Sequence, residues 1–371
     1  MRYQQVCLES FGYCLPEQIV SSDEIERRLE PLYRRLRLPE GRLELMTGIQ
    51  QRRVWPRGML PSEKSVESGR HALEAADIDP GKIGALIHAS VCRDHLEPAT
   101  ACRVHHELGL PSDCMIYDTS NACLGLMNGA VQIANMIELG QIQAGLVVGT
   151  EDSGPLMRST LDELNSNESL TRSQIKLAVA SLTIGSGSCA MLLVDRETSR
   201  TDNRLLGATV QANTRHHQLC HSGKDEAVGG GMNPLMETDS EALMREGIAT
   251  GVVTFAQFLE ELGWSPRDID RSVCHQVGSA HRRMMLGGLD LNPDNDFATF
   301  KWLGNTGSVA LPITMAIGCQ AGVVQADEQV ALLGIGSGIN CLMLATHWQK
   351  SLVSSPGEMI LPENLSQAAT I

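Results

Sequence analysis

Aromatic residues, positive charge and long hydrophobic runs are all scarce in this chain of 371 residues. Phe, Trp and Tyr make up 4% of it, which argues against base stacking on single-stranded nucleic acid. Lys and Arg number 30 against 44 Asp and Glu, for a net charge of −14. Broad binding to nucleic acid or to anionic membranes is therefore not expected. No segment reaches the roughly 20 apolar residues of a membrane span, and Met1 to Leu15 lacks a secretory apolar run.

Cysteine pairs at metal-ribbon spacing are also absent, although the chain has 11 cysteines. An odd number of cysteines without a CxxC pair predicts a reduced, cytoplasmic protein with free thiols. Residues His216, His217, Cys220 and His221 form a compact cluster that could ligate zinc. Because closed zinc sites need four ligands at fitting spacing, loop packing is the favoured interpretation, and we expect no metal.

Buried strands alternate with helices along the sequence. Apolar runs predict strands at Ile83–Val91, Ala144–Gly149, Cys189–Val194, Arg271–Cys274 and Val330–Gly334. Segments of helical period predict helices at Ser65–Ala76, Gly125–Leu139, Thr254–Leu262 and Leu311–Ala321. Such alternation is typical of α/β proteins in which helices cover both faces of parallel or mixed sheets.

The chain contains a faint internal repeat. Residues 121–150 and 305–337 each run from a small-residue turn through a long helix to a strand, and residues 79–90 resemble 265–277. The repeat predicts two duplicated α/β halves, 1–195 and 196–349, followed by a polar tail at 350–371. In the middle of the chain, residues 201–247 lack clear periodicity and are rich in Gly, His and Asn, as in a functional loop or lid.

Cys123 stands out within the segment DTSNACLGLMNGA (118–130). It falls where a strand is expected to end and a long helix to begin, among the small residues Ser120, Ala122, Gly125 and Gly129. A helix N-terminus offers positive partial charge and free N–H groups, which stabilise a thiolate. Because the thiolate is the nucleophile, the pattern favours a reactive cysteine.

Two polar residues occupy matching points of the second half. His275 follows a strand-like run in CHQVGSAH, and Asn305 lies in a glycine-bounded turn in WLGNTGS. Donors of these types can stabilise an enolate or an oxyanion, and a histidine can activate a cysteine. If the two halves face each other, the three residues converge; alone, His275 could equally be a half-buried structural histidine.

These motifs resemble the Cys-His-Asn triad of thiolase-superfamily condensing enzymes of the 3-oxoacyl-[acyl-carrier-protein] synthase III group. TGIQQRR (47–53) and GIGSGIN (334–340) are similar to further elements of that family, and the resemblance covers residues 3 to 348. It implies a thiolase-like five-layered αβαβα fold, a homodimer and an acyl thioester carried on Cys123. It also implies an oxyanion hole formed by the N–H groups of Cys123 and Ser337.

Within that group, the chain is most similar to OleA-type acyl-CoA condensing enzymes. HLEPATACRVHHELGL (95–110) resembles their segment carrying a glutamate, here Glu97. The resemblance implies that Glu97 reaches the neighbouring subunit's site and acts as a base. Residue type alone would favour a surface carboxylate. The chain departs from the initiating synthases in two motifs: Met46 precedes TGI, and the motif that begins at His275 reads HQVGS.

The expected activity is therefore a Claisen condensation of two acyl-CoAs through an acyl-cysteine, with coenzyme A thioesters as substrates and no permanently bound cofactor. The alternatives are an acyl-carrier-protein synthase III that condenses acyl-CoA with malonyl-carrier in fatty acid biosynthesis, and a noncatalytic scaffold subunit. Arg52 and Arg53 could contact the phosphates of coenzyme A, since arginine suits phosphate, but a solvated surface run is equally plausible.

Overall fold

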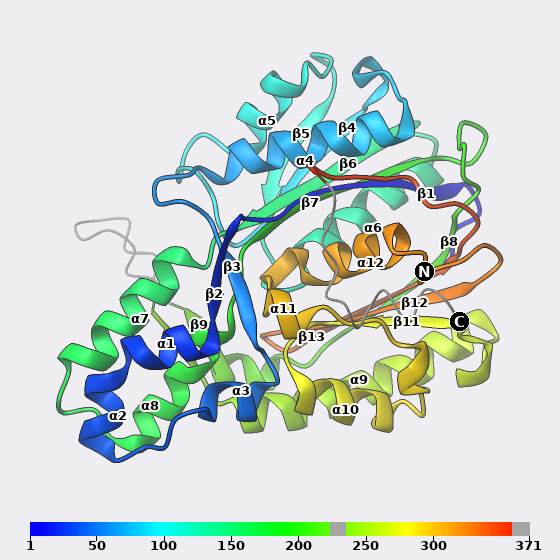
Figure 1. Ribbon diagram of the computed structural model, residues 1–371. Helices are drawn as coiled ribbons and strands as arrows, with labels where there is room; N and C mark the ends of the chain where they lie inside the picture. Colours follow the sequence, from blue (N-terminus) through cyan, green and yellow to red (C-terminus); the bar gives the residue numbers. More distant parts are fainter. Residues whose placement is uncertain (223–234, 358–371) are drawn as a thin grey trace.

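Five alternating layers of helices and strands make up the protein (Figure 1). The computed structural model describes residues 1–222 and 235–357. From one side to the other, the layers consist of α4 (Pro61–Ala76) and α5 (Thr100–Leu108); strands of the first half; α6 (Gly125–Glu138) and α12 (Ala310–Gln320); strands of the second half; and α9 (Ser240–Leu262) and α10 (Ser279–Gly288). The expected αβαβα fold is confirmed.

The two halves share one strand topology. The first half has the strand order β5-β4-β6-β7-β1 and the second has β11-β12-β13-β8. The equivalent pairs β4–β6 and β11–β12 are parallel. The two pairs that follow in each half are antiparallel, namely β6–β7 and β7–β1 in the first and β12–β13 and β13–β8 in the second. The strands are β1 (Val6–Cys14), β4 (Ala85–Ala89), β5 (Met115–Thr119), β6 (Ala144–Glu151), β7 (Gly187–Asp195), β8 (Arg204–Ala212), β11 (Arg271–Cys274), β12 (Gln329–Gly336) and β13 (Asn340–His347). The duplication inferred from the sequence is thus visible as repeated topology.

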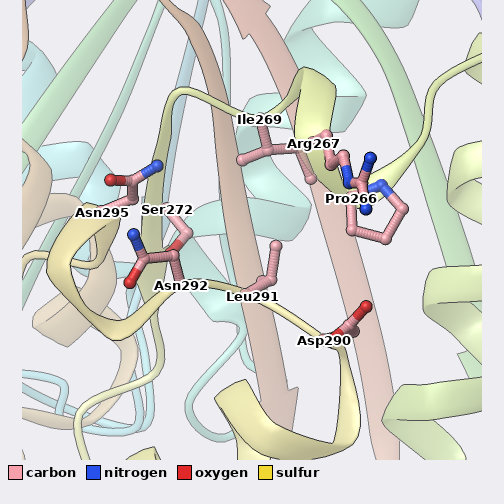
Figure 2. Close-up of a pocket in the computed structure, with 8 residues that line it drawn as sticks. All are labelled: Pro266, Arg267, Ile269, Ser272, Asp290, Leu291, Asn292 and Asn295. Carbon is pink, nitrogen blue, oxygen red and sulfur yellow. The ribbon is translucent and has the colours of Figure 1, made fainter.

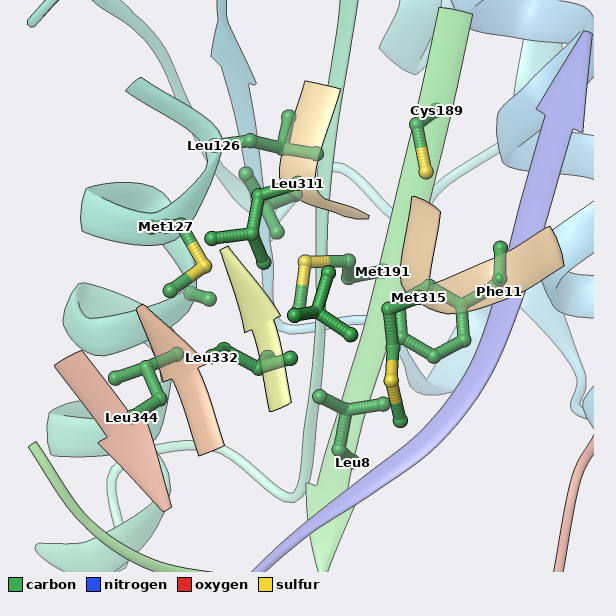
Figure 3. Packing of buried hydrophobic residues seen from close by; sticks show 14 of the residues in the cluster. Leu8, Phe11, Leu126, Met127, Cys189, Met191, Leu311, Met315, Leu332 and Leu344 are labelled. Carbon is green, nitrogen blue, oxygen red and sulfur yellow. The ribbon is translucent and has the colours of Figure 1, made fainter. Parts of the chain in front are cut away.

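The inner strands β4, β6, β7, β12 and β13 are mostly apolar because each lies between two helical layers. In β7, Met191 contacts the core around α6 and α12, whereas its neighbour Leu192 contacts the core beneath α4 and α5. In β12, Leu332 belongs to the central core and Leu333 to the core beneath α9 and α10. Successive side chains point to opposite faces of a strand, so strands buried on both faces read as continuous apolar runs. Figure 3 shows the central core.

A small helical cap lies to one side of the layers (Figure 1). Residues of α1, α2, α3, α7 and α8 share a fourth apolar cluster. The cap is built from α1 (Ser22–Arg28), α2 (Glu30–Leu36), α3 (Arg42–Thr47), α7 (Gly154–Ser166) and α8 (Arg172–Ala178), next to the antiparallel pair of β2 (Gln18–Ser21) and β3 (Gln51–Val54).

The segment 201–247 is more regular than its sequence indicates. It contains β8, the short pair β9 (Cys220–Ser222) and β10 (Met236–Thr238), and the first turns of α9. The prediction of one long irregular loop is therefore wrong. Strand β8 has the small residues Gly207 and Ala208 beside β13, which weakens its apolar signal. Part of this segment, 223–234, which includes the glycine-rich run VGGGM (228–232), lies outside the described residues.

The start of the expected tail also makes contact with the sheet. The short strand β14 (Val353–Ser354) pairs with Phe11 and Gly12 of β1. Residues 196–203, between the two halves, connect the end of β7 to the start of β8.

Close packing of α4 on β1 yields a stability prediction. A Cβ atom on Gly12 would lie 2.0 Å from Ser68 O and 2.3 Å from Ala72 N, so Gly12→Ala should destabilise the protein by about 1–3 kcal/mol. The control is Gly287→Ala in α10, where a Cβ meets no atom within 4 Å and should be neutral or stabilising by up to about 1 kcal/mol. Urea unfolding measures both, and equal stability of the two variants would contradict this packing.

Candidate active site

Cys123 lies at the tip of a tight turn between β5 and α6. Leu124 N–H donates to Asn121 O at 2.9 Å, and the intervening Ala122 has φ +44°. A left-handed backbone is uncommon for a residue with a side chain, and such residues cluster at functional sites. A Cβ on Gly125 would lie 3.4 Å from Ser308 Cβ and 3.5 Å from Ala89 C. The small residues of the motif thus allow this turn to approach the second half.

The surroundings of Cys123 do not favour a resting thiolate. Burial is the main cause that raises the pKa of the Cys123 thiol to about 12, with smaller contributions from the nearby Cys220 and Glu151. This direction runs against the thiolate that the sequence predicts at the helix N-terminus, which stays a prediction. Helix α6 begins only at Gly125, and a helix terminus contributes too little to offset the loss of hydration.

Ser337 lies next to this turn, between β12 and β13. A Cβ on Gly336 would lie 3.8 Å from Cys123 N, so the end of β12 runs beside the Cys123 backbone. Asn340 Nδ2 donates to Ser337 O at 3.2 Å and to Asn121 Oδ1 at 3.3 Å, which ties the two turns together. The two backbone segments expected to form an oxyanion hole are thus neighbours.

His275 lies at the carboxyl end of β11. Its backbone N–H donates to Leu333 O at 3.0 Å, and the residue is 4% exposed. Its Nδ1 atom has no hydrogen-bond partner among the described residues. Burial lowers the pKa of His275 to about 3, with a smaller effect from the nearby His281. The ring is therefore neutral at physiological pH and can donate only one N–H.

Asn305 is fixed by both its backbone and its side chain. Its N–H donates to Thr183 O at 3.0 Å, and its carbonyl accepts from Gly185 N–H at 2.8 Å. Its side-chain Oδ1 accepts from Gly307 N–H at 3.0 Å. Because the amide oxygen is occupied, the Nδ2 group is the donor that remains for a ligand.

Gln276, which follows His275, links the two motifs and was missed as a site residue by the sequence analysis. Its Oε1 accepts the N–H groups of Thr299 and Phe300, at 2.8 and 3.0 Å. These residues begin α11 (Phe300–Leu303), which leads directly to Asn305. Its Nε2 donates to Cys274 O. The "HQ" pair was the available signal: the histidine faces the site and the glutamine fixes the next segment.

Glu97 lies on the exposed loop between β4 and α5. Among the described residues, no hydrogen bond or ion pair to its carboxylate is found. Its loop is held at its far end by Asp118, whose carboxylate accepts from Thr100 N–H and Ala101 N–H at 2.8 and 2.9 Å. Within the single chain described, Glu97 thus lies on the surface instead of joining Cys123, His275 and Asn305.

The two arginines do not form the expected basic surface. Arg52 is fully buried, donating to Val20 O and Ser22 Oγ, and burial lowers its pKa to about 10. Its Cβ lies 3.2 Å from a Cβ built on Gly304, so Arg52 supports the loop of Asn305. Arg53 is half-buried and donates to Pro16 O at 2.8 Å. The expected contact with coenzyme A phosphates does not fit Arg52, because a buried guanidinium cannot meet a surface phosphate.

The cluster of His216, His217, Cys220 and His221 does not converge on one point in the described part of the chain. His216 and His221 instead lie beside Glu246 and Glu237, at 3.5 and 3.6 Å. The one group there with metal-ligating atoms within 4.8 Å of one another is Cys14, Glu67 and His71, far from this cluster in sequence.

An apolar cavity of about 290 Å³ opens within the helical cap. Two of its lining residues, Met46 and Leu182, are sequence neighbours of Thr47 and Thr183. Thr183 O accepts from Asn305 N–H, and Thr47 O would lie 2.6 Å from a Cβ on Gly278. The cavity lining is thus connected through the backbone to segments that contact the Asn305 and His275 loops, although Cys123, His275, Asn305 and Ser337 do not line it. A second cavity of about 230 Å³, lined by polar and apolar residues, lies beside β11, and its lining includes none of the site residues (Figure 2).

Helices of the described residues give no candidate for a membrane span.

Comparisons with known proteins agree with this geometry. Residues 45–194 match the thiolase N-terminal domain, and residues 259–348 match the 3-oxoacyl-[acyl-carrier-protein] synthase III C-terminal domain. An acyl-CoA:acyl-CoA alkyltransferase from Shewanella oneidensis is 40% identical over 94% of this chain and 100% of its own length. One from Xanthomonas campestris pv. campestris is 33% identical over 94% and 100%.

Solved structures give the same result. A cysteine-to-alanine variant of Xanthomonas campestris OleA superposes with a TM-score of 0.88 at 32% identity, covering 94% of this chain and 98% of that one. A cysteine-to-serine variant with bound lauric acid and lauroyl-CoA has a TM-score of 0.87 at 32% identity, covering 93% and 100%. The duplicated fold and its Cys-His-Asn motifs are those of a thiolase-superfamily condensing enzyme. The chain belongs to the acyl-CoA:acyl-CoA alkyltransferase (OleA) family.

The raised pKa of Cys123, whose side chain is partly exposed, gives a prediction for its reactivity. In a Cys102→Ser background, which removes an exposed thiol, iodoacetamide alkylation of Cys123 should keep rising from about pH 7 to about pH 10. The raised pKa keeps the thiol protonated throughout that range, so the rate should reach no plateau. Peptide mass spectrometry locates the adduct, and Cys123→Ser is the control. A plateau near neutral pH would show a resting thiolate instead.

Proposed function

We propose that the protein condenses two acyl-CoA thioesters head to head, through an acyl-cysteine on Cys123, to a 2-alkyl-3-oxoacyl product. One observation carries the proposal: within a chain of the OleA family, the Cys123 turn lies beside both the Ser337 turn and the Asn305 turn. The apolar cavity in the helical cap supports a substrate with a hydrocarbon chain, since apolar linings select apolar ligands.

In the first half-reaction, Cys123 Sγ attacks the carbonyl carbon of an acyl-CoA. The N–H groups of Cys123 and Ser337 donate hydrogen bonds to the oxyanion that forms. The thiol proton passes to His275 and then to the departing coenzyme A sulfur. Because the raised pKa of Cys123 and the lowered pKa of His275 both oppose charge separation in the free site, attack depends on the oxyanion donors taking up the negative charge.

In the second half-reaction, a base removes an α-proton from the second acyl-CoA. We assign this base to Glu97 of the opposite subunit. The resulting enolate oxygen accepts from His275 and from Asn305 Nδ2. Its α-carbon then attacks the thioester carbonyl of Cys123, the carbon–sulfur bond breaks, and Cys123 departs as a thiolate. The sulfur regains a proton from solvent, and Glu97 releases to solvent the α-proton that it took. The product leaves as the 2-alkyl-3-oxo acid after hydrolysis of its thioester.

This assignment requires a homodimer, which the edge of the first sheet supports. Strand β5 is the terminal strand of the sheet, and its first residue, Met115, is 55% exposed. An unpaired edge strand is a template for pairing with another chain. Leu96, beside Glu97, is 56% exposed. Pairing at this edge would cover these apolar side chains and carry the Glu97 loop to the neighbouring subunit. We further place the reaction in the cytoplasm, without a permanently bound cofactor.

The main alternative is a synthase III reaction, in which malonyl-carrier loses carbon dioxide to form the enolate and no Glu97 base is needed. A β-ketoacyl-[acyl-carrier-protein] synthase III of Streptomyces coelicolor is 24% identical over 92% of the chain, a more distant relationship than that to the alkyltransferases. Such a reaction would connect the protein to fatty acid biosynthesis and to an acyl carrier protein. A noncatalytic scaffold is disfavoured, because Cys123, His275 and Asn305 are all present.

The deciding experiment uses one long-chain acyl-CoA as sole substrate. Mass spectrometry should detect a 2-alkyl-3-oxo acid or the ketone formed by its decarboxylation, and Cys123→Ala should form neither. If acylated Cys123 accumulates and turnover begins only when malonyl-carrier is added, the protein is a synthase III and head-to-head condensation is wrong.

The position of Glu97 in the neighbouring site is tested by complementation. Glu97→Ala and Cys123→Ala should each be inactive in condensation, but co-expression should restore about a quarter of wild-type activity, because half of randomly assembled dimers are mixed and each has one complete site. Glu97→Ala should still become acylated on Cys123. Absence of recovery in a purified mixed dimer would place Glu97 in its own subunit's site or outside the mechanism.

A further inference from the structure

We infer that Glu151 is a positioning residue that holds the Asn305 turn and the start of the Glu97 loop in one network, and thereby serves the condensation step. This role rests on the proposed function, because it concerns the same site. Nothing in the sequence analysis assigned Glu151 a function. Its signal was an acidic residue at the end of the apolar run of β6, in GLVVGTE.

A single carboxylate oxygen of Glu151 joins the two segments. Glu151 is 5% exposed. Its Oε1 accepts from Val91 N–H at 3.1 Å, from Ser308 N–H at 3.3 Å and from the Ser308 hydroxyl. Val91 begins the loop that carries Glu97, and Ser308 ends the turn that begins at Asn305. A buried carboxylate that accepts several such bonds is strongly held, and removing it leaves these donors unpaired.

The Glu151 side chain also lies directly beneath the residue that orients Asn305. A Cβ on Gly307 would lie 3.1 Å from Glu151 Cγ, and Gly307 has φ +58°. Gly307 N–H is the donor to Asn305 Oδ1. Glu151 therefore fixes the position of the Gly307 peptide, whose N–H sets the orientation of the Asn305 amide. That orientation directs Asn305 Nδ2 toward the enolate.

On the other side, Glu151 fixes where the Glu97 loop leaves β4. Ser90 Oγ donates to Thr150 O at 2.7 Å, and Cys92 N–H donates to Ser90 Oγ at 2.9 Å. Together with the bond from Val91 to Glu151, these contacts bind the start of the loop to the last residues of β6. The end of the loop is held separately by Asp118, so loss of Glu151 loosens the start of the loop and leaves its end in place.

The charge of Glu151 also reaches the nucleophile. Burial raises the pKa of Glu151, and the hydrogen bonds from Ser308 and Val91 and from the Cys92 side chain lower it. In turn, Glu151 and Cys220 are the two groups that raise the pKa of Cys123 beyond the effect of burial. Neutralising Glu151 without moving it should therefore make Cys123 more acidic, an effect that a purely mechanical support would not produce.

Three variants test the inference. In Glu151→Ala, the condensation kcat with one acyl-CoA should fall about 10²-fold, the usual cost of misplacing a catalytic group. Single-turnover acylation of Cys123 should stay within a few-fold, since the Cys123 and Ser337 turns do not bond to Glu151. Glu151→Gln can still accept the same three bonds and should recover most of the condensation rate. Its Cys123 alkylation profile should shift to lower pH.

The matched control is Asp152→Asn, the neighbouring carboxylate, which accepts from Gly154 N–H and Ser186 Oγ, outside the Asn305 turn and the Glu97 loop, and should behave as wild type. Hydrogen exchange gives a readout independent of turnover: Glu151→Ala should accelerate exchange in residues 91–99 and 305–309 together, but not in β11. Exchange confined to one segment, an unchanged condensation rate, or no recovery in Glu151→Gln would overturn the inference. Wild type that acylates but never condenses would instead overturn the proposed function, while the exchange result still decides the role of Glu151.

Discussion

Close packing of one pair of helices between two sheets is the constraint on which the site depends. Helices α6 and α12 share the central core with strands of both halves, and each begins at the edge where the motifs lie, directly after the Cys123 turn and the Asn305 turn. Glycine stands at their contacts with the strands: a Cβ on Gly129 of α6 would come within 2.5 Å of Val147 in β6, and one on Gly187 of β7 within 2.7 Å of Ile313 in α12. Duplication thus brings equivalent helix starts face to face.

The same packing disfavours charged side chains in the resting site. Burial raises the pKa of Cys123 and Glu151 and lowers the pKa of His275 and His281. Each shift disfavours the charged form of its group in a site where water is excluded. The donors that remain are fixed in place, namely the turn N–H groups and the Asn305 amide. Donors of this kind favour charge that develops on a substrate over charge on the protein itself, which suits a reaction whose intermediates are an oxyanion and an enolate.

Much of this architecture follows from the sequence, because strands covered on both faces and small-residue turns leave local patterns. The helix and strand alternation, the duplication and the motifs of Cys123, His275 and Asn305 were all readable. Strand β1 was not, since Glu9 interrupts its apolar run and is satisfied by Ser199, Arg200 and Thr201, distant in sequence. Arg52 was misjudged for the same reason: its side chain points inward from β3, where Val20 O and Ser22 Oγ accept its hydrogen bonds. Pairings between distant segments leave no local pattern.

The distribution of groups between buried and exposed positions also bears on the order of events. The nucleophile, its neighbouring turns and the Asn305 amide are assembled within one chain, whereas Glu97 lies on that chain's surface beside an unpaired strand edge. In the proposed mechanism, one subunit holds the groups that accept an acyl group but lacks the base that forms the enolate. Acylation would then depend on one subunit and proton abstraction on the contact between two. Glu151 bonds both to the Asn305 turn and to the start of the Glu97 loop, so it connects the two segments that this mechanism assigns to the enolate and to the base.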